Sequence, residues 1–427
     1  MKFTKSIEYL NKAKKTIPLA SQTFSKSYLQ YPPTISPVAI DHALGAYAYD
    51  IDGNRYLDMV NSLAAILLGY CDPDVNLAVK RQLDKGSIFS LPSTLELEVS
   101  ELLVDIIPCA EMIRFGKNGS DATSAAVRVS RAFTGKDRIA ACGYHGWHDW
   151  YIGTTTRSKG VPEAVSKLTD LFAYNDISSL ESLFEQHPNQ YAAVILEPMN
   201  AYWPKNNFLE QVQNLCRQHN AVLIFDETVT GFRYGLGGAQ ELFSITPDLC
   251  VLGKGLANGF PLSAVVGKKE IMHCFNDIFF STTFGGETLS LAAAKAAINK
   301  LQSSNALTTI HKNGQRLKER LNNQITHYQL QDKIKIIAHP AWSFVDMSRC
   351  DELDVMKLKT LYIQTMLANN VICLGTHNIS SAFKEDELEI LCNAYDEFFQ
   401  LMSKIHHQDD LNAILKVPAL KPIMKIR

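Results

Sequence analysis

One acid and one lysine stand at comparable positions near the middle of the chain. Asp226 ends the apolar run AVLIFD, and Lys254 directly follows a second apolar run in DLCVLGKG. Both runs have the length and composition of buried strands, so each ionisable group is expected at the end of a strand. A lysine taken out of water is a usable amine nucleophile. The pair matches the needs of a pyridoxal phosphate site, where a lysine forms a Schiff base and an acid pairs with the pyridine nitrogen.

Each of these two residues also has an ordinary explanation. A lysine after a strand usually points into solvent, and a buried carboxylate could pair with an internal arginine such as Arg233. Gly253 and Gly255, however, allow a ligand to approach the backbone beside Lys254 closely. Because Asp226 and Lys254 occur together, the combination favours the cofactor over both ordinary explanations.

Three further turns carry groups that could hold the rest of such a cofactor. Gly119 and Ser120 begin the helical sequence GSDATSAAVRVSRA, and the free N–H groups of a helix N-terminus attract phosphate. Thr283 lies in the glycine-rich turn STTFGGET, and Tyr144 in GYHGWHDW could lie flat on an aromatic ring. Ser120 and Thr283 could equally be helix caps, because hydroxyls at a helix start accept backbone hydrogen bonds.

Other chemistries find little support in the sequence. His145 and His148 are three residues apart, but no further cluster of metal-ligating residues accompanies them, so no metal site is expected. The chain contains no GxSxG, P-loop or GxGxxG motif.

The elements expected to position these residues alternate between strands and helices. Between residues 110 and 270, short apolar strands are followed by amphipathic helices, which predicts an α/β fold with an open, largely parallel sheet. Ligands bind at the carboxyl ends of the strands in such sheets. Asp226, Glu197 and the turn at Gly119 are all expected at that edge. The polar segment Thr154–Ala173 is expected to be a mobile loop.

Both ends of the chain are expected to contribute to a smaller α+β domain. The first residues predict a helix that ends at Pro18, and GAYAYDIDGNRYLDMV has the signature of a hairpin around Asp-Gly-Asn. We expect residues 1–65 and 326–427 to form the small domain and residues 66–325 to form the large, cofactor-binding domain.

Composition narrows the class of protein. The 427 residues carry a formal net charge of −2, which gives no electrostatic reason to expect nucleic acid or an anionic membrane as a partner. Nine cysteines occur without a CxxC pair, and the odd number argues against a disulfide framework. No stretch has the apolar core of a signal peptide or the length of a membrane span. A cytoplasmic enzyme or binding protein is expected.

Five motifs together resemble the class III, fold-type I pyridoxal-phosphate aminotransferases. They are AYAYDIDGNRYLDMV, FGKNGSDATSAAVRVSRAFTG, GYHGWHDW, DETVTGFR and GKGLANGFPLSA, and they follow the order of the family over about residues 40–300. Within the family the chain is most similar to the branch that contains glutamate-1-semialdehyde 2,1-aminomutase. The resemblance implies a mostly parallel large domain and a small domain built from the two chain ends.

The resemblance also implies a role for each matching residue. Lys254 would form the Schiff base with pyridoxal 5'-phosphate and move the proton between substrate and cofactor, and Asp226 would pair with the pyridine nitrogen. The other implied contacts are Tyr144 and Thr228 on the two ring faces, Gly119 and Ser120 at the phosphate, Thr283 at the phosphate of the neighbouring subunit, and Glu197 near the cofactor. A contact across subunits implies a homodimer with a shared active site.

Two departures from the family pattern bear on the substrate. Many members have Gln at the position of Val229, touching the phenolic oxygen of the cofactor, whereas an apolar residue resembles the aminomutase branch. The aminomutase has an arginine near its N-terminus for the substrate carboxylate, but here SQTFSKS offers Lys26, which lacks arginine's two-pronged fork. We therefore expect an aminotransferase that moves an amino group between a donor and a small carbonyl compound. An aminomutase is the first alternative, and a catalytically silent binding relative is the second.

Overall fold

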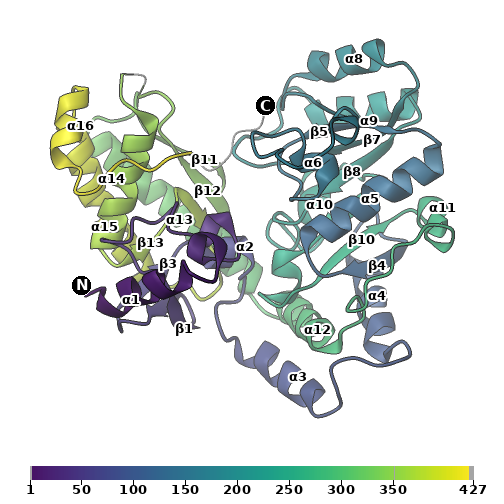
Figure 1. Ribbon diagram of the computed structural model, residues 1–427, viewed down its shortest axis with the longest axis horizontal. Coiled ribbons are helices and arrows are strands. Elements are labelled where there is room, and N and C mark those ends of the chain that lie inside the picture. Colours follow the sequence, from purple (N-terminus) through teal and green to yellow (C-terminus); the bar gives the residue numbers. More distant parts are fainter. Residues whose placement is uncertain (1, 351, 423–427) are drawn as a thin grey trace. The chain divides into compact units, whose positions relative to one another are not determined.

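The structure is a computed structural model that describes residues 2–350 and 352–422 (Figure 1). These residues form two compact units. The terminal unit contains the described parts of Met1–Leu63, Leu67–Asp72 and Thr308–Ile423, and the central unit contains Ala64–Ile66 and Pro73–Leu307. The described N-terminal and C-terminal segments therefore fold into one unit, and the long middle segment folds into the other.

A seven-stranded sheet lies at the centre of the described part of the central unit. Its order is β4 (Met112–Gly116), β10 (Ser263–Gly267), β9 (Leu249–Leu252), β8 (Val222–Asp226), β7 (Tyr191–Leu196), β5 (Arg138–Cys142) and β6 (Thr169–Leu171). β10 pairs antiparallel with β4 and β9, and the remaining neighbours pair in parallel. This confirms the predicted α/β fold with a largely parallel sheet.

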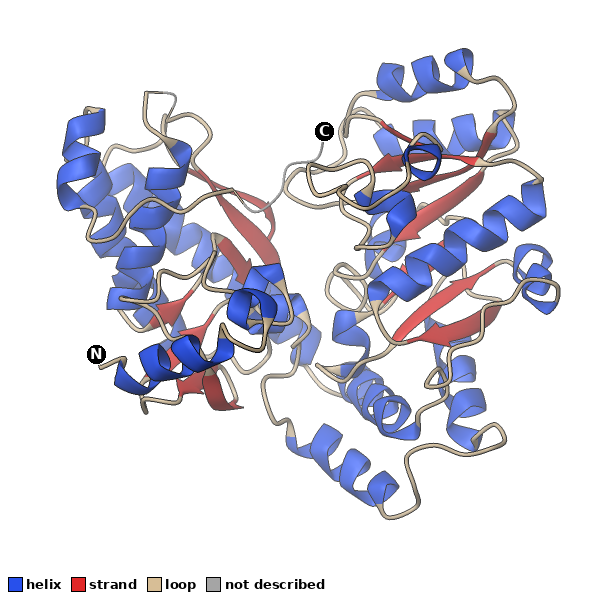
Figure 2. Cartoon of the chain, viewed as in Figure 1, coloured by secondary structure: helices blue, strands red, loops and turns tan. Residues whose placement is uncertain are grey.

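Helices cover both faces of this sheet (Figure 2). Successive side chains of a strand point to opposite faces, so neighbouring residues of β7 and β8 enter different cores. Ile195 and Ile224 pack in one apolar cluster with Ala126 of α5 (Gly119–Thr134). Val194 and Leu223 pack in a second cluster with α8 (Ile177–Gln186) and α9 (Phe208–Gln218). Burial on both faces explains why these strands are uninterrupted apolar runs in the sequence.

Helices and short helical turns make up most of the rest of the central unit. They are α3 (Pro73–Leu83), α4 (Thr94–Ile106), α6 (Asp149–Ile152), α7 (Glu163–Ser166), α10 (Gly238–Phe243), η3 (Lys254–Ala257), α11 (Lys269–Met272), η4 (His273–Asn276) and α12 (Thr288–Ser303). α13 (Ala306–His327) follows and enters the terminal unit at Thr308.

The prediction of a loop over Thr154–Ala173 is wrong for the part from Glu163 to Leu171. This segment contains α7 and the edge strand β6, which pairs in parallel with β5. The Thr169 hydroxyl also donates a 2.7 Å hydrogen bond to the Trp150 carbonyl. An edge strand of three residues is too short to show a period in the sequence, so only the pairing with β5 reveals it.

The terminal unit contains two smaller sheets and a set of helices. Its strands are β1 (Ile40–Leu44), β2 (Tyr47–Asp50), β3 (Arg55–Asp58) and β13 (Val371–Ile372) in one sheet and β11 (Lys335–His339), β12 (Trp342–Asp346) and β14 (Thr376–Asn378) in the other. Its helices besides α13 are α1 (Thr4–Ala13), α2 (Asn61–Ala64, which reaches the unit boundary), α14 (Val355–Ala368), α15 (Glu385–Ser403), α16 (Gln408–Ile414) and the turns η1 (Pro18–Ala20) and η2 (Phe24–Lys26). β2 and β3 form the predicted hairpin. α1 ends earlier than expected, at Ala13.

The short turn α2 has an unusual backbone. Its four residues, none of them glycine, all have φ between 45° and 68°, the left-handed region that L-residues avoid. Asp58 accepts the backbone N–H groups of Val60 and Asn61 just before the turn, at 2.8 and 3.0 Å. Arg233 donates a 3.0 Å hydrogen bond to the carbonyl of Ala64 at its end. These bonds hold a conformation that the residues would not adopt alone.

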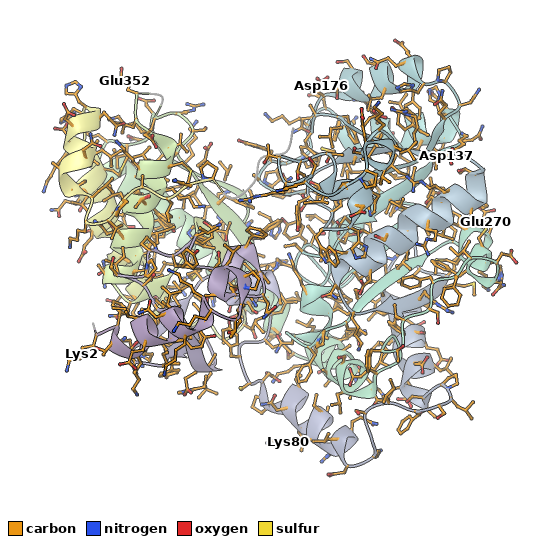
Figure 3. The ribbon with its side chains drawn as sticks, in the orientation of Figure 1. Lys2, Lys80, Asp137, Asp176, Glu270 and Glu352 are labelled. Carbon is orange, nitrogen blue, oxygen red and sulfur yellow. The ribbon has the colours of Figure 1, made fainter. Side chains whose placement is uncertain are left out.

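Charged side chains of both signs lie on the outside of the central unit. Lys80, Asp137 and Glu270 are exposed examples (Figure 3). Within residues 2–350 and 352–422, no helix combines the length and apolarity needed to cross a membrane. No disulfide joins any of the nine cysteines, all of which lie in these ranges.

Candidate active site

Three predicted site residues stand at the carboxyl edge of the central sheet. Asp226 is the last residue of β8, Glu197 follows β7, and Lys254 follows β9 after Gly253. β8 and β9 are parallel neighbours, and Asp226 pairs in register with Val251. Lys254 has φ 45°, so the chain turns sharply as it leaves the strand. The sheet therefore brings the acid and the amine to the same edge, as its strand pattern predicts.

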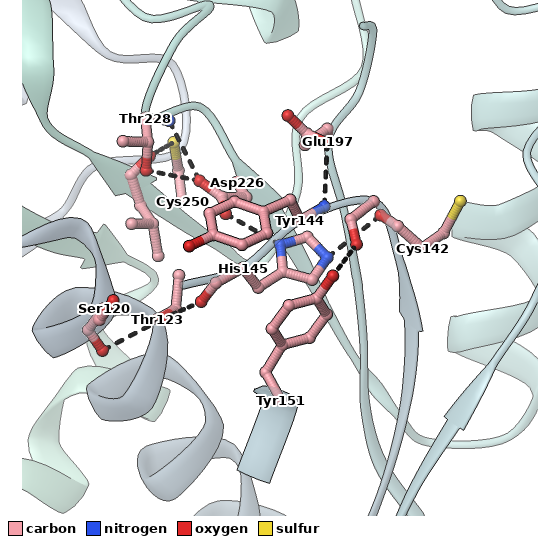
Figure 4. Close-up of polar contacts among 12 residues, drawn as sticks. Ser120, Thr123, Cys142, Tyr144, His145, Tyr151, Glu197, Asp226, Thr228 and Cys250 are labelled. Atoms are coloured by element: carbon pink, nitrogen blue, oxygen red, sulfur yellow. Dashed lines mark hydrogen bonds and ion pairs between the residues drawn. The ribbon is translucent and has the colours of Figure 1, made fainter. Parts of the chain in front are cut away.

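Asp226 is fixed by hydrogen bonds from both sides (Figure 4). One carboxylate oxygen, Oδ2, lies 2.9 Å from Nδ1 of His145. The other, Oδ1, accepts the Thr228 backbone N–H at 3.1 Å and the Thr228 hydroxyl at 2.6 Å. The partner of the buried acid is thus a histidine and not Arg233, which donates instead to the carbonyl of Ala64.

His145 is completely enclosed, and both of its ring nitrogens face acceptors. Nε2 lies 3.1 Å from the carbonyl oxygen of Cys142, while Nδ1 faces Asp226. Since a neutral imidazole has a single N–H, the ring satisfies both acceptors only when both nitrogens carry protons. Burial by itself raises the pKa of Asp226, but the hydrogen bonds from His145 and Thr228 outweigh it and lower the pKa overall. Asp226 is therefore a carboxylate at neutral pH.

Lys254 is half-buried and lies within electrostatic reach of two acids. Burial lowers the pKa of its amine because the charged form loses water, and Glu197 and Asp226 oppose this effect. The positive charge of Arg233 adds to the lowering. The net result is an amine that loses its proton more readily than an exposed lysine does.

Glu197 and Tyr144 are joined through the backbone. Oε2 of Glu197 accepts the Tyr144 N–H at 3.1 Å, and burial together with the charge of Asp226 raises the pKa of Glu197. Gly143 has φ 105°, and a Cβ there would lie 2.5 Å from Oε2 of Glu197, so only glycine fits. The Tyr144 side chain remains 49% exposed, and burial and the charge of Asp226 raise its pKa. A ring this exposed can take up a stacking partner.

The N-terminus of α5 meets the turn that follows β8. A Cβ at Gly119 would lie 3.2 Å from the Thr228 side chain, and a Cβ at Gly253 would lie equally close. The Ser120 hydroxyl accepts the Trp147 N–H at 3.2 Å. α5 has 16 residues, so its first N–H groups provide the partial positive charge that a phosphate group needs.

The remaining predicted residues occupy three different places. Val229 is half-buried in the turn after Thr228. Thr283 is exposed in the segment between η4 and α12. Lys26 is exposed in η2 and belongs to the terminal unit.

The part that His145 plays in this site is not predicted from the sequence, where His145 and His148 together suggest only a possible metal site. In the structure His148 lies 2.6 Å from the Ser124 hydroxyl and 3.9 Å from an Asp121 oxygen. The position of His145 in the sequence is the feature that could have indicated this role. It lies just beyond the end of β5, at the same sheet edge as Asp226.

The residues present fit pyridoxal phosphate. A buried carboxylate is held ionised, an amine of lowered pKa stands beside it, and a long helix begins at a turn with a buried hydroxyl. An added Cβ at Gly119 or at Gly253 would press against the Thr228 side chain, so the absence of side chains at both positions lets this turn sit close to the start of α5 and to the end of β9. The fold and the site thus define an α/β enzyme of the kind that uses this cofactor.

Residues 30–382 match the sequence model of the aminotransferase class-III family, and the chain belongs to this family. It is 32% identical to the 3-aminobutyryl-CoA aminotransferase of Cloacimonas acidaminovorans (strain Evry), with 88% of this chain and 92% of that protein covered. It is also 32% identical to the glutamate-1-semialdehyde 2,1-aminomutase of Methanococcoides burtonii, with 92% of this chain and 98% of that protein covered.

Solved structures agree with this assignment. The PLP form of the FumI protein from Sphingopyxis sp. MTA144 is similar with a TM-score of 0.86 at 25% identity, covering 96% of this chain and all of that chain. An omega-transaminase from Sphaerobacter thermophilus gives a TM-score of 0.84 at 25% identity, covering 92% of this chain and 97% of that chain. The predicted fold-type I architecture, cofactor and enzyme class are confirmed: the protein is a pyridoxal-phosphate-dependent enzyme of the class III aminotransferase family.

Proposed function

We propose that Lys254 is the residue that attaches the cofactor and moves the proton, and that Asp226 holds the pyridine nitrogen. The observation that carries this proposal is the position of the two groups. Asp226 ends β8 and Lys254 follows the adjacent parallel strand β9, so both lie at one sheet edge, where Asp226 is 5% exposed and kept ionised by His145. When bound, pyridoxal phosphate supplies an aldehyde carbon that links to amines and a ring that withdraws electrons.

The two residues divide the acid–base work between them. The lowered pKa of Lys254 leaves a larger fraction of the amine unprotonated, so it can take a proton from the carbon next to the transferred nitrogen. The nearby Glu197 and Asp226 stabilise the ammonium form that results, so the same nitrogen can return the proton. Asp226, held by His145 and Thr228, keeps a proton on a facing ring nitrogen.

The surrounding residues are proposed to orient and shield the cofactor. Tyr144 and Thr228 would lie on the two faces of the ring, and Val229 would pack beside its phenolic oxygen. Gly119 and Ser120 at the start of α5 would bind the phosphate. Glu197 would hold the backbone of Tyr144 in place, as its 3.1 Å hydrogen bond to that N–H supports.

The reaction we propose moves an amino group from a small-molecule donor to a small carbonyl acceptor. Lys26 is proposed to bind an anionic group of the substrate, because it lines a cavity of about 580 Å³ in the terminal unit. Asp58, Tyr70 and Ser62 also line this cavity. A second candidate is an aminomutase, which the apolar Val229 and the relatives of that name favour.

A half-reaction distinguishes these two functions. The purified protein loaded with cofactor is mixed with candidate amino acids or amines, and the products are identified by mass spectrometry. Release of a carbonyl product without an added acceptor supports the aminotransferase. An isomer of the substrate with no carbonyl product would instead establish the aminomutase.

We further propose that the enzyme is a cytoplasmic homodimer whose active sites are shared. Thr283 is exposed near apolar side chains that a second copy would cover, with Phe279 83% and Phe284 57% exposed. In the dimer Thr283 would contact the phosphate in the partner's site. Light scattering on the purified protein gives the mass in solution. A monomer that still performs the half-reaction at the full rate would rule out the shared site.

A further inference from the structure

Glu227 is a buried carboxylate that the proposed chemistry does not use. It follows Asp226 directly and has no exposed surface. Oε2 accepts the Thr230 hydroxyl at 2.8 Å and the Ala239 backbone N–H at 2.5 Å. Oε1 accepts the backbone N–H of Gln240 at 3.1 Å and its side-chain amide at 3.0 Å.

The four donors divide evenly between the two oxygens, so the site is built for a carboxylate. Glutamine could replace only one oxygen with another acceptor, and its NH₂ group would meet two donors at the other position. The four hydrogen bonds lower the pKa of Glu227, but burial outweighs them and raises it overall, so it is the arrangement of the donors that marks the position as one for a carboxylate. Removing one of these acceptors lowers the stability of the fold, because the buried donor has given up its hydrogen bonds to water and gains none in return.

The backbone around Glu227 is shaped to the carboxylate. Gly238 has φ 75°, and a Cβ there would lie 2.3 Å from Oε2 of Glu227. The main-chain carbonyl of Glu227 accepts the Gly231 N–H at 2.9 Å, and a Cβ at Gly231 would lie 2.8 Å from that oxygen. Glycine is therefore needed at both positions for the chain to close around this residue.

These contacts connect Glu227 to the candidate active site in three directions. Its side chain joins the turn Glu227–Gly231 to the first residues of α10. Its backbone N–H donates to the carbonyl of Val251 at 2.9 Å, on the strand that leads to Lys254. The turn itself carries Thr228, whose hydroxyl and N–H bind Asp226.

The geometry points to Glu227 as a positioning residue: its carboxylate holds the turn Glu227–Gly231 against α10 and so fixes how Asp226 and Thr228 face the cofactor. This inference rests on the proposed roles of Asp226 and Lys254. Glu227 does not touch the reacting atoms, and it acts only through the geometry of its neighbours.

The test compares Glu227→Gln with a matched control, Glu241→Gln. Glu241 also accepts a backbone N–H in this region, from Gly237 at 2.8 Å, but it is exposed and its hydrogen-bond partner lies outside the turn Glu227–Gly231. Thr230→Val is the milder second variant, since it keeps the shape and removes one of the four donors. The affinity for pyridoxamine 5'-phosphate is measured by titration, because this ligand cannot link to Lys254 and reports fit alone.

We expect Glu227→Gln to weaken this affinity about five- to thirty-fold, the effect of about two lost hydrogen bonds, and Thr230→Val to weaken it less. Glu241→Gln should change it less than about twofold, as for a surface substitution. In protein without cofactor, hydrogen exchange at Gly231, Ala239 and Gln240 should be faster in Glu227→Gln than in the control.

A double-mutant cycle separates positioning from general stability. If Glu227 acts through Asp226, then Glu227→Gln in an Asp226→Asn background weakens binding much less than it does in the wild type. Equal losses in both backgrounds would overturn the inference, as would a Glu227→Gln variant that matches Glu241→Gln. If Asp226→Asn itself leaves the affinity unchanged, the proposed role of Asp226 fails instead.

Discussion

His145 and Asp226 form a buried pair, with 2.9 Å between Nδ1 and Oδ2, although they are 81 positions apart in the sequence. Nε2 of the same imidazole reaches the carbonyl of Cys142 at the end of β5. The ring therefore ties the acid of β8 to the end of another strand of the sheet. His145 is a positioning residue, because it sets the orientation and charge of the group that we propose to hold the cofactor.

Replacing His145 with alanine should weaken both the fold and the site. Without the hydrogen bond and charge of His145, the effect of burial is opposed mainly by Thr228, so the pKa of Asp226 is expected to rise. Removing one partner of a buried pair costs about 3–5 kcal/mol of unfolding free energy. We expect a loss at the lower end of this range in urea unfolding, and at least about a tenfold weaker affinity for pyridoxamine 5'-phosphate. His148→Ala is the matched control, because His148 is partly exposed and contacts Ser124. Similar losses in the two variants would contradict the role of His145.

The lowered pKa of Asp226 predicts how stability depends on pH. Because the folded protein binds fewer protons at this site, the contribution is fully present above the unfolded pKa of about 3.9 and is lost as the pH falls through the lower folded value. Urea unfolding of cofactor-free wild type and Asp226→Asn is compared from about pH 6 to about pH 3. The stability difference between them should shrink below about pH 4. A difference that stays constant over this range would show that the native carboxylate is not held ionised.

Gly143→Ala should disturb the link between Tyr144 and Glu197. The new Cβ would lie 2.5 Å from Oε2 of Glu197, at a residue with φ 105°. We expect a loss of about 2–3 kcal/mol in unfolding free energy, together with a slower half-reaction. Gly135→Ala is a matched control, since Gly135 has φ 67° and no atom within 4 Å of the added Cβ. It should cost about 1 kcal/mol and leave the half-reaction unchanged. A Gly143→Ala variant with an unaltered half-reaction would show that this link does not matter to the chemistry.

The sequence predicted the parts of the site that lie at strand ends. Asp226 and Lys254 follow long apolar runs, and such runs are typical of strands buried on both faces. The family motifs assign Thr228 and Gly119 to the site, and the structure brings them so close that a Cβ on Gly119 would lie 3.2 Å from the Thr228 side chain.

The parts that could not be predicted depend on pairing between distant segments. The contact of His145 with Asp226 exists only because β5, β7 and β8 lie in this order in the sheet. The same holds for β6, whose three residues become a strand through pairing with β5. The four donors to Glu227 likewise come from a turn and a short helix that have no common pattern in the sequence.

The central claim is that Lys254 attaches the cofactor, and reduction with borohydride tests it most directly. The purified protein is loaded with pyridoxal phosphate, reduced, digested, and analysed by peptide mass spectrometry. We predict one modified lysine, Lys254, which carries the mass of the reduced cofactor, and no modification at any position in Lys254→Ala. Modification of another lysine in the wild type, or cofactor still covalently bound in Lys254→Ala, would contradict the account.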